Sequence, residues 1–414
     1  MTIIIDNLSI IAGAVIIVLT LAATLTDVFL RKPKISASLE MGKNEAENET
    51  SEEAESNTED GQEMPPEDTS ETEEEENLPP LSIIVTPHNN ALELEQNLPL
   101  LLEQDYPAPF KVIVVFWRGE SDTDDVLKKH AANPHLYSTY IPESSRYMSR
   151  KKLAITVGEK AAKTEWLLLT DITCRPQSNQ WLRAMARHAL PSRNLVLSHT
   201  RYDEETPLFR RFLRSYTSLY LMKEAERGTA YRHEGNALML RRSEFERRDG
   251  FRNNLKYLRG EYDFTVNEYA QPGSAAVENS PEGTLVEQNP TDKEWRNKQL
   301  YYLEDRQHLL RTPAHRWRHN LSQTLLHVSF LALLATIAFA IITQRWPLAA
   351  LAGLLLILSI VLRTWMASRT LRLMDESVPA WRIFPYEMRM LWHNLAFKIR
   401  YWRANKDDFI THKV

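Results

Sequence analysis

Carboxylate, hydroxyl and amide side chains recur in this sequence directly after short apolar runs. Asp171 and Thr173 follow one run, and Glu120 and Asp122 follow another. A carboxylate at such a place can hold a divalent cation, and a second carboxylate can take a proton from an attacking hydroxyl group. The simpler alternative is that these acids cap turns, because Asp side chains commonly accept hydrogen bonds from nearby backbone N–H groups.

The apolar runs alternate with helical patterns, so the elements that must position these side chains can be predicted. Four strands are expected, over Leu81–Thr86, Lys111–Phe116, Leu136–Ile141 and Glu165–Thr170. Strands that alternate with helices predict an α/β fold with a mostly parallel sheet and a ligand site at the carboxyl ends of the strands. The polar residues expected there are Thr86, Pro87, His88, Asn89, Asn90, Glu120, Asp122, Asp124, Asp171 and Thr173.

Four segments in a fixed order resemble the membrane-bound family 2 glycosyltransferases, which have a GT-A nucleotide-sugar fold. They are "LSIIVTPHNN", "SRKKLAITVGEKAAKTEWLLLTDITCRPQSNQWL", "EGNALMLRRSEFERRDGF" and "GEYDFTVNEYA". The resemblance covers about Leu81 to His308 and continues into paired apolar helices. It implies an enzyme that moves a sugar, with inversion, from a nucleotide-diphosphate donor to a lipid-linked or polysaccharide acceptor, as in polysaccharide biosynthesis.

The resemblance also implies roles for individual residues. Asp171 would hold Mg²⁺ or Mn²⁺, with Thr173 at the place of the family's second Asp. Glu261 would be the catalytic base, with Asp263 as a close second, because the two acids around Tyr262 can be aligned in two ways. Both acids could instead be solvated carboxylates at a helix start. The residues implied for donor binding are Thr86, Pro87, Asn90, Glu120, Asp122, Lys152, Asp171, Trp295 and Gln299.

Some positions depart from the family pattern. A hydroxyl group at Thr173 is a weaker cation ligand than a carboxylate, and Tyr302 or Leu303 stands where an Arg is expected. Lys151 and Lys152 could be phosphate ligands or charges on the surface of a helix. The alternative to an enzyme is therefore a degenerate, non-catalytic glycosyltransferase-like membrane partner or regulatory platform, since function depends on the site residues and not on the fold.

Three apolar stretches are typical of transmembrane helices: Leu8–Leu30, Leu321–Ile342 and Trp346–Ser368. Lys and Arg residues flank them at 31–34, 311–318 and 369–372, which predicts a multi-pass protein of the cell inner membrane with its soluble domain in the cytoplasm. The tail at 371–403 mixes basic and aromatic residues, which is typical of a helix that lies against membrane lipids, although it could also pack on the soluble domain.

Charged residues are unevenly distributed along the chain. The chain carries a net charge of -5, but Glu40–Glu76 holds 17 acidic residues and one basic residue. The rest has 49 basic and 38 acidic residues, which favours lipid head groups or phosphate-bearing small molecules over nucleic acid. Cys174 is the single cysteine, so neither a disulfide framework nor a cysteine-built zinc site is possible.

We expect an N-terminal transmembrane helix at 1–34, a disordered acidic linker at 35–80, a GT-A domain at 81–310, a transmembrane hairpin at 311–370 and an interfacial tail at 371–414.

Overall fold

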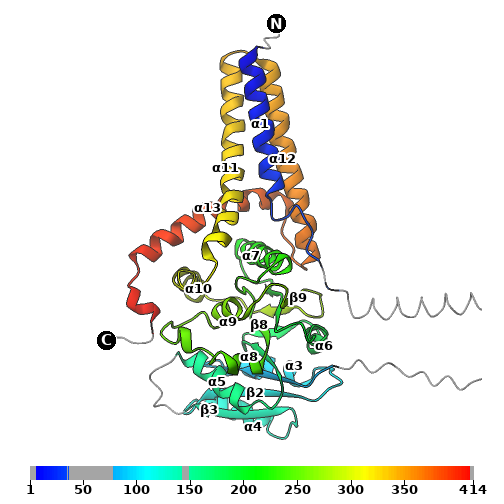
Figure 1. The fold of residues 1–414 in the computed structure, drawn as a ribbon, viewed down its shortest axis with the longest axis vertical. Coiled ribbons are helices and arrows are strands. Elements are labelled where there is room, and N and C mark those ends of the chain that lie inside the picture. The colour runs from blue at the N-terminus through cyan, green and yellow to red at the C-terminus, as the bar shows by residue number, and fades with distance from the viewer. Residues whose placement is uncertain (1–5, 35, 37–77, 142–148, 411–414) are drawn as a thin grey trace, which may run out of the picture.

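The structure is a computed structural model that describes residues 6–34, 36, 78–141 and 149–410. An α/β domain carries three long helices that stand side by side at one end of it (Figure 1). Almost all of the predicted acidic linker lies outside the described residues, which include only Ser36 and Leu78–Pro80 of that segment.

The main sheet has seven strands in the order β3-β2-β1-β4-β8-β6-β9. Neighbours from β3 to β4 are parallel, β8 is antiparallel to both β4 and β6, and β6 is parallel to β9. The predicted mostly parallel sheet is therefore confirmed. The strands are β1 Leu81–Val85, β2 Phe110–Trp117, β3 Leu136–Ile141, β4 Trp166–Thr170, β6 Leu195–Ser198, β8 Ala237–Arg241 and β9 Ala275–Glu278.

The central strands β1 and β4 are buried on both faces of the sheet, which explains their continuous apolar runs. Ile83 and Ile84 are adjacent in β1, yet Ile83 packs with Leu168 on one face, whereas Ile84 packs with Leu169 on the other. Successive side chains of a strand point to opposite faces, so every residue of the run meets a core. A second, three-stranded sheet has the order β5-β10-β7, with β5 Cys174–Pro176, β7 Thr200–Tyr202 and β10 Leu285–Glu287.

Helices cover both faces and close the domain toward the long helices (Figure 1). Those of the domain are α3 Ala91–Leu102, α4 Ser121–Lys129, α5 Arg150–Ala161, α6 Trp181–Ala186, α7 Leu208–Arg227, α8 Arg242–Arg247, α9 Glu261–Tyr269 and α10 Asp292–Asp305. Short 3-10 turns lie at Arg252–Asn254 and Lys406–Phe409. Helix α7 lies between the domain and the long helices, where Phe212 and Tyr216 pack against Phe29, just after the first long helix.

The three predicted membrane stretches form helices long and apolar enough to cross a membrane: α1 Asn7–Leu25, α11 Thr312–Ile342 and α12 Trp346–Leu373. The tight hairpin expected between the second and third stretches is present, since only 343–345 separate the two helices. Arg345 in this turn pairs with Asp6 at 2.8 Å, at the start of α1. At the other end, buried Arg363 of α12 contacts Asp27 and Glu387, each at 2.9 Å, and so ties the bundle to the C-terminal helix.

The C-terminal helix, α13 Ala380–Arg403, packs on the rest of the molecule along one face and leaves another face exposed. Ile383, Met390 and Phe397 are buried against the domain and the bundle. Trp381 and Trp392 are 72% and 67% exposed on the remaining surface of the helix. A helix with one face packed and with exposed Trp and basic side chains on another is suited to lie along a membrane interface.

Candidate functional site

A cavity of about 660 Å³ lies where the carboxyl end of β4 meets α9, α10 and α11. Lys151 and Asp171 line it at the strand end, and Glu261 and Asp263 line it at the start of α9. From there it continues to the first turns of α11 and to α13. It therefore joins the predicted ligand edge of the sheet to the base of the apolar helices.

At the strand end, Lys151 links two of the predicted site residues. Its Nζ lies 2.5 Å from Asp171 Oδ1 and 3.6 Å from Glu261 Oε1, and it also lies 4.7 Å from the centre of the Tyr262 ring. Burial by itself would lower the pKa of the Lys151 ammonium group, but the carboxylates of Asp171 and Glu261 outweigh burial and raise the pKa. Lys151 therefore places a fixed positive charge between two carboxylates that are distant in sequence.

The same contacts bear on the predicted metal site. One oxygen of Asp171 is held by Lys151, and the hydroxyl group of Thr173 lies 4.0 Å from Cys174 Sγ. Among the described residues, no group of three His, Cys, Asp or Glu side chains could hold a metal ion. Mg²⁺ is usually held in proteins by one or two carboxylates together with substrate phosphates and water. Here the one carboxylate at the implied site is paired with Lys151, and the other group, Thr173, is an uncharged hydroxyl, so the described residues do not offer a free carboxylate at the cation site that the resemblance implies.

The acids of α9 begin the helix, where a left-handed residue is required. Gly260 has φ +84°, and a Cβ atom there would lie 2.8 Å from Asp305 Oδ2, so only glycine fits this close approach. Glu261 and Asp263 occupy the first turn of the helix that follows. Burial raises the pKa of Asp263 from 3.8 to about 6, against the opposing effect of Arg232, whose guanidinium lies 3.7 Å from Asp263 Oδ1. An acid that titrates near neutral pH can accept and release a proton during turnover.

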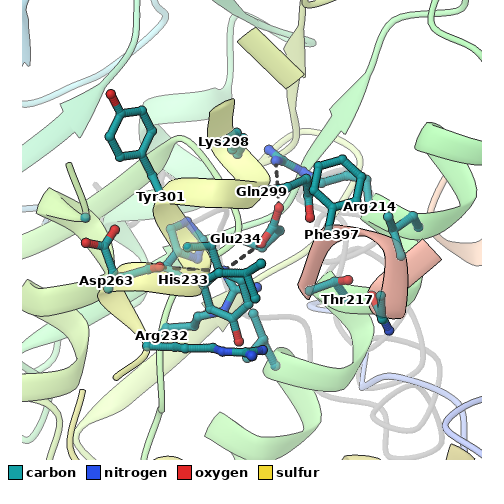
Figure 2. A pocket seen from close by; sticks show the side chains of 18 of the residues that line it. Arg214, Thr217, Arg232, His233, Glu234, Asp263, Lys298, Gln299, Tyr301 and Phe397 are labelled. Carbon is teal, nitrogen blue, oxygen red and sulfur yellow. Dashed lines mark hydrogen bonds and ion pairs between the residues drawn. The ribbon is translucent and has the colours of Figure 1, made fainter. Parts of the chain in front are cut away.

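Two buried arginines, Arg214 and Arg232, line the same cavity as Asp263 (Figure 2). Arg214 of α7 contacts Glu234 at 3.3 Å and Glu287 at 2.9 Å, and Arg232 contacts Glu234 at 2.6 Å. Burial would raise the pKa of Glu234, but Arg232, Lys298 and Arg214 lower it to about 2. Sequence reasoning did not find Arg214 or Arg232. A signal for Arg232 was present, because it stands in a polar segment at 232–236 that directly precedes the apolar strand β8.

The predicted product-side residues lie on α10. Trp295 and Gln299 both line the cavity, and a capping box formed by Thr291 and Glu294 fixes the start of the helix. Tyr302 and Leu303, the two residues that could stand where an Arg is expected, both line the cavity, and the Arg232 guanidinium lies 4.0 Å from the centre of the Tyr302 ring. A guanidinium from another element thus lies against this position of α10.

The predicted donor-side residues after β1 and β2 lie apart from this cavity. Thr86, Pro87, Asn90, Glu120 and Asp122 do not line it. One of them, Glu120, belongs to a group of contacting side chains that we call the rim cluster, which consists of His88, Trp117, Glu120 and Arg150. His88 Nδ1 lies 2.6 Å from Glu120 Oε1, its Nε2 lies 2.9 Å from Arg150, and the Arg150 guanidinium lies 4.9 Å from the centre of the Trp117 ring.

Lys152, which the resemblance implied as a donor ligand, has a different place. Its side chain is fully buried, and its Nζ donates to the carbonyl groups of Asn254 at 2.6 Å and Tyr257 at 2.8 Å. Lys151 lines the cavity, whereas Lys152 does not. The arrangement therefore favours Lys151 over Lys152 as the lysine that faces a ligand, and Lys152 supports the loop before α9.

Comparisons with known proteins give no sequence match, since no protein-family profile and no curated protein matches the chain. Among solved structures, the chain is similar to mannosyltransferase PcManGT from Pyrobaculum calidifontis in complex with GDP-Man and Mn²⁺, with a TM-score of 0.47 and 19% identity, covering 86% of this chain and 99% of that one. It is also similar to TarS 1-349 from S. aureus, with a TM-score of 0.38 and 14% identity over 71% of this chain and 88% of that one. The same TarS region in complex with UDP-GlcNAc gives a TM-score of 0.39 and 13% identity, covering 71% of this chain and 88% of that one.

Proposed function

We propose that the chain is an inverting glycosyltransferase that moves a sugar from a nucleotide-diphosphate donor to a lipid-linked or growing polysaccharide acceptor at the cytoplasmic face of the inner membrane. The observation that carries this proposal is the cavity itself. It joins Lys151 and Asp171, at the strand end, to the acids Glu261 and Asp263, and it continues to the first turns of α11. Three of the four segments that resemble family 2 glycosyltransferases contribute residues to this cavity.

The chemistry requires one base and a means to stabilise the leaving group. The acceptor hydroxyl oxygen forms a bond to the anomeric carbon while the bond from that carbon to the diphosphate oxygen breaks, with its electron pair staying on the diphosphate. The raised pKa of Asp263 supports giving Asp263, and not Glu261, the role of accepting the hydroxyl proton. The close pairing of Glu261 with Lys151 favours a positioning role for Glu261 instead.

The nucleoside is proposed to lie over the rim cluster at the ends of β1 and β2. In open α/β sheets, ligands bind beside the carboxyl ends of the strands. Glu120 offers a carboxylate there, and Trp117 and His88 offer ring surfaces 6.3 Å apart. On this arrangement the donor extends from the rim, past Asp171, into the cavity, where its sugar meets Asp263.

The acceptor is proposed to enter from the membrane side. His319 and Gln323 of α11 and Asn394 of α13 line the far end of the cavity, next to the apolar span of α11. A lipid-linked or growing glycan could lie against these polar side chains while its lipid anchor stays in the bilayer. The exposed Trp residues of α13 would sit among the lipid head groups.

The proposed orientation follows from the basic residues beside the membrane helices. Reporter fusions after Lys34 and at Val414 should therefore report the cytoplasm, and a fusion at Gln344 the opposite side. A C-terminal reporter on the outer side would contradict the orientation while leaving the proposed chemistry open to its own test.

The function is tested with purified full-length protein and a panel of nucleotide sugars. A ligand that binds only the folded state stabilises it by about 2.7 kcal/mol at a concentration one hundred times its dissociation constant, so a donor should raise the unfolding temperature. That donor, labelled in its sugar, should then pass its label to a membrane lipid extract or glycan. If no nucleotide sugar shifts unfolding or is consumed, the enzyme proposal is wrong.

A second candidate is a non-catalytic membrane partner or regulatory platform that keeps the fold. The ion-paired state of Asp171 and the hydroxyl group at Thr173 favour this candidate, because both depart from the family's cation motif. It predicts a folded protein that binds no donor and that co-purifies with a membrane protein through the bundle or α13. Donor binding in the experiment above would exclude it.

A further inference from the structure

The resemblance implies a divalent cation beside Asp171, and in this chain the Lys151 ammonium group lies beside that carboxylate. Its Nζ lies 2.5 Å from Asp171 Oδ1 and 3.6 Å from Glu261 Oε1, and its side chain is only 18% exposed. We propose that Lys151 binds the diphosphate of the donor and offsets the charge of the leaving group without a divalent cation. This inference rests on the proposed function, which it deepens.

Competition for one carboxylate is the first argument. A cation bound to Asp171 would have to displace the ammonium group from Asp171 Oδ1 or share the site with it. Two like charges a few ångströms apart repel each other by several kcal/mol in partly buried surroundings. The other ligand of the family motif is Thr173, which is a weaker, uncharged oxygen. The described residues thus favour the ammonium group over the divalent ion.

The ammonium group also has enough hydrogen-bond donors to bind a phosphate oxygen. It carries three N–H bonds, and the contacts to Asp171 and Glu261 use at most two of them. The third is available to a phosphate oxygen, because Lys151 lines the cavity. Asp171 is then a positioning residue that fixes the ammonium group at the strand end, where the family places a metal ligand.

The surrounding charges fit a diphosphate as well. Arg232, Arg259 and Lys298 line the same cavity as Lys151. Of the acids, Glu234 and Glu287 are paired with Arg214, and burial together with Asp263 and Glu261 raises the pKa of Asp305 well above its usual range. Lysine and arginine side chains outnumber aspartate and glutamate side chains among the residues that line the cavity, which favours an anionic ligand such as a leaving diphosphate.

The test is titration calorimetry of UDP and GDP into the purified full-length protein, once in EDTA and once in Mn²⁺. We expect the tighter of the two nucleotides to bind with affinities that agree within about threefold between the two conditions. Lys151→Met should weaken binding by about tenfold to a hundredfold in both, the usual loss for a hydrogen bond to a charged group. Lys160→Met, on the exposed surface of the same helix, is the matched control and should bind as the wild type does.

Two further variants keep the proposal open to contradiction if Lys151→Met does not fold. Lys151→Arg keeps the charge and should retain metal-independent binding. Asp171→Asn removes the carboxylate that the family would use for a metal, and its affinity should be the same in EDTA and in Mn²⁺. Binding that tightens more than tenfold with Mn²⁺, or that survives Lys151→Met unchanged, would overturn the inference and leave the proposed function standing. Absence of nucleotide binding under every condition would overturn both.

Discussion

The rim cluster beside β1 and β2 and the cavity beneath α9 contain the same kinds of side chain in different surroundings. In the rim cluster, the His88 side chain is 42% exposed and meets one carboxylate and one guanidinium. In the cavity, Arg214 and Arg232 are buried, and each touches two acids. Water screens charges at the rim, whereas the buried charges interact strongly and shift one another's pKa. The comparison teaches that substitutions of similar chemistry should have very different effects in the two places.

The largest effect is expected on the proposed sugar transfer in the Asp263→Asn variant, because Asp263 is the proposed base. Removing a general base typically slows a reaction by 10²–10⁴-fold. Because Asp263 must be ionised to accept a proton and its pKa is raised to about 6, wild-type transfer should also fall as pH decreases through about 6. Transfer of labelled sugar measured from pH 5 to 8 checks both expectations. The Glu261→Gln variant should still show the fall in transfer below about pH 6. If that fall disappears in Glu261→Gln but persists in Asp263→Asn, Glu261 and not Asp263 is the base.

A large effect on stability is expected for Arg214→Met. The substitution leaves Glu234 and Glu287 without their shared partner, and breaking a buried ion pair on one side typically costs about 3–5 kcal/mol of unfolding free energy. Denaturant unfolding of the detergent-solubilised protein measures this change. Arg201→Met, whose partner Asp375 is 55% exposed, serves as the comparison and should cost less than about 1 kcal/mol. Equal costs would show that the cavity wall is screened like the surface.

A smaller loss of stability is expected for Lys152→Met, without a loss of nucleotide affinity. The carbonyl groups of Asn254 and Tyr257 lose their donor, at a cost of about 1–3 kcal/mol of unfolding free energy. Nucleotide affinity of the folded variant should match that of the wild type, because Lys152 faces away from the cavity. Weakened nucleotide binding with unchanged stability would restore the donor-binding role that the sequence implied.

The smallest effect is expected at the rim. Glu120→Gln replaces the partner of His88 in the rim cluster, and one solvent-accessible hydrogen bond contributes about 0.5–1.5 kcal/mol. Nucleotide affinity should therefore fall by about threefold to tenfold, with unfolding free energy within about 1 kcal/mol of the wild type. An unchanged affinity for every nucleotide would show that the nucleoside does not lie over the rim cluster.

The sequence by itself determined the elements, because their signals are local. The bounds of β1 and β4 were predicted to within one residue, and the long apolar stretches at 321–342 and 346–368 became α11 and α12, although α11 begins earlier, at Thr312. Their length and apolar character are properties of consecutive residues. The sequence also placed Asp171 at the carboxyl end of a strand and Asp263 in an acidic helix start, both of which line the cavity.

Only the tertiary structure decided how distant charges meet. Nothing in the spacing of Lys151 and Lys152 tells which of them faces a cavity, because that choice depends on how α5 packs on the sheet. Likewise, Arg232, which precedes β8 in sequence, contacts Asp263 of α9 and the Tyr302 ring of α10, both of which are distant from it along the chain. The pKa of Asp263 follows from that burial and not from its neighbours in sequence. Charge pairing and desolvation act through space, so residue types alone could nominate the site residues but could not assign their roles.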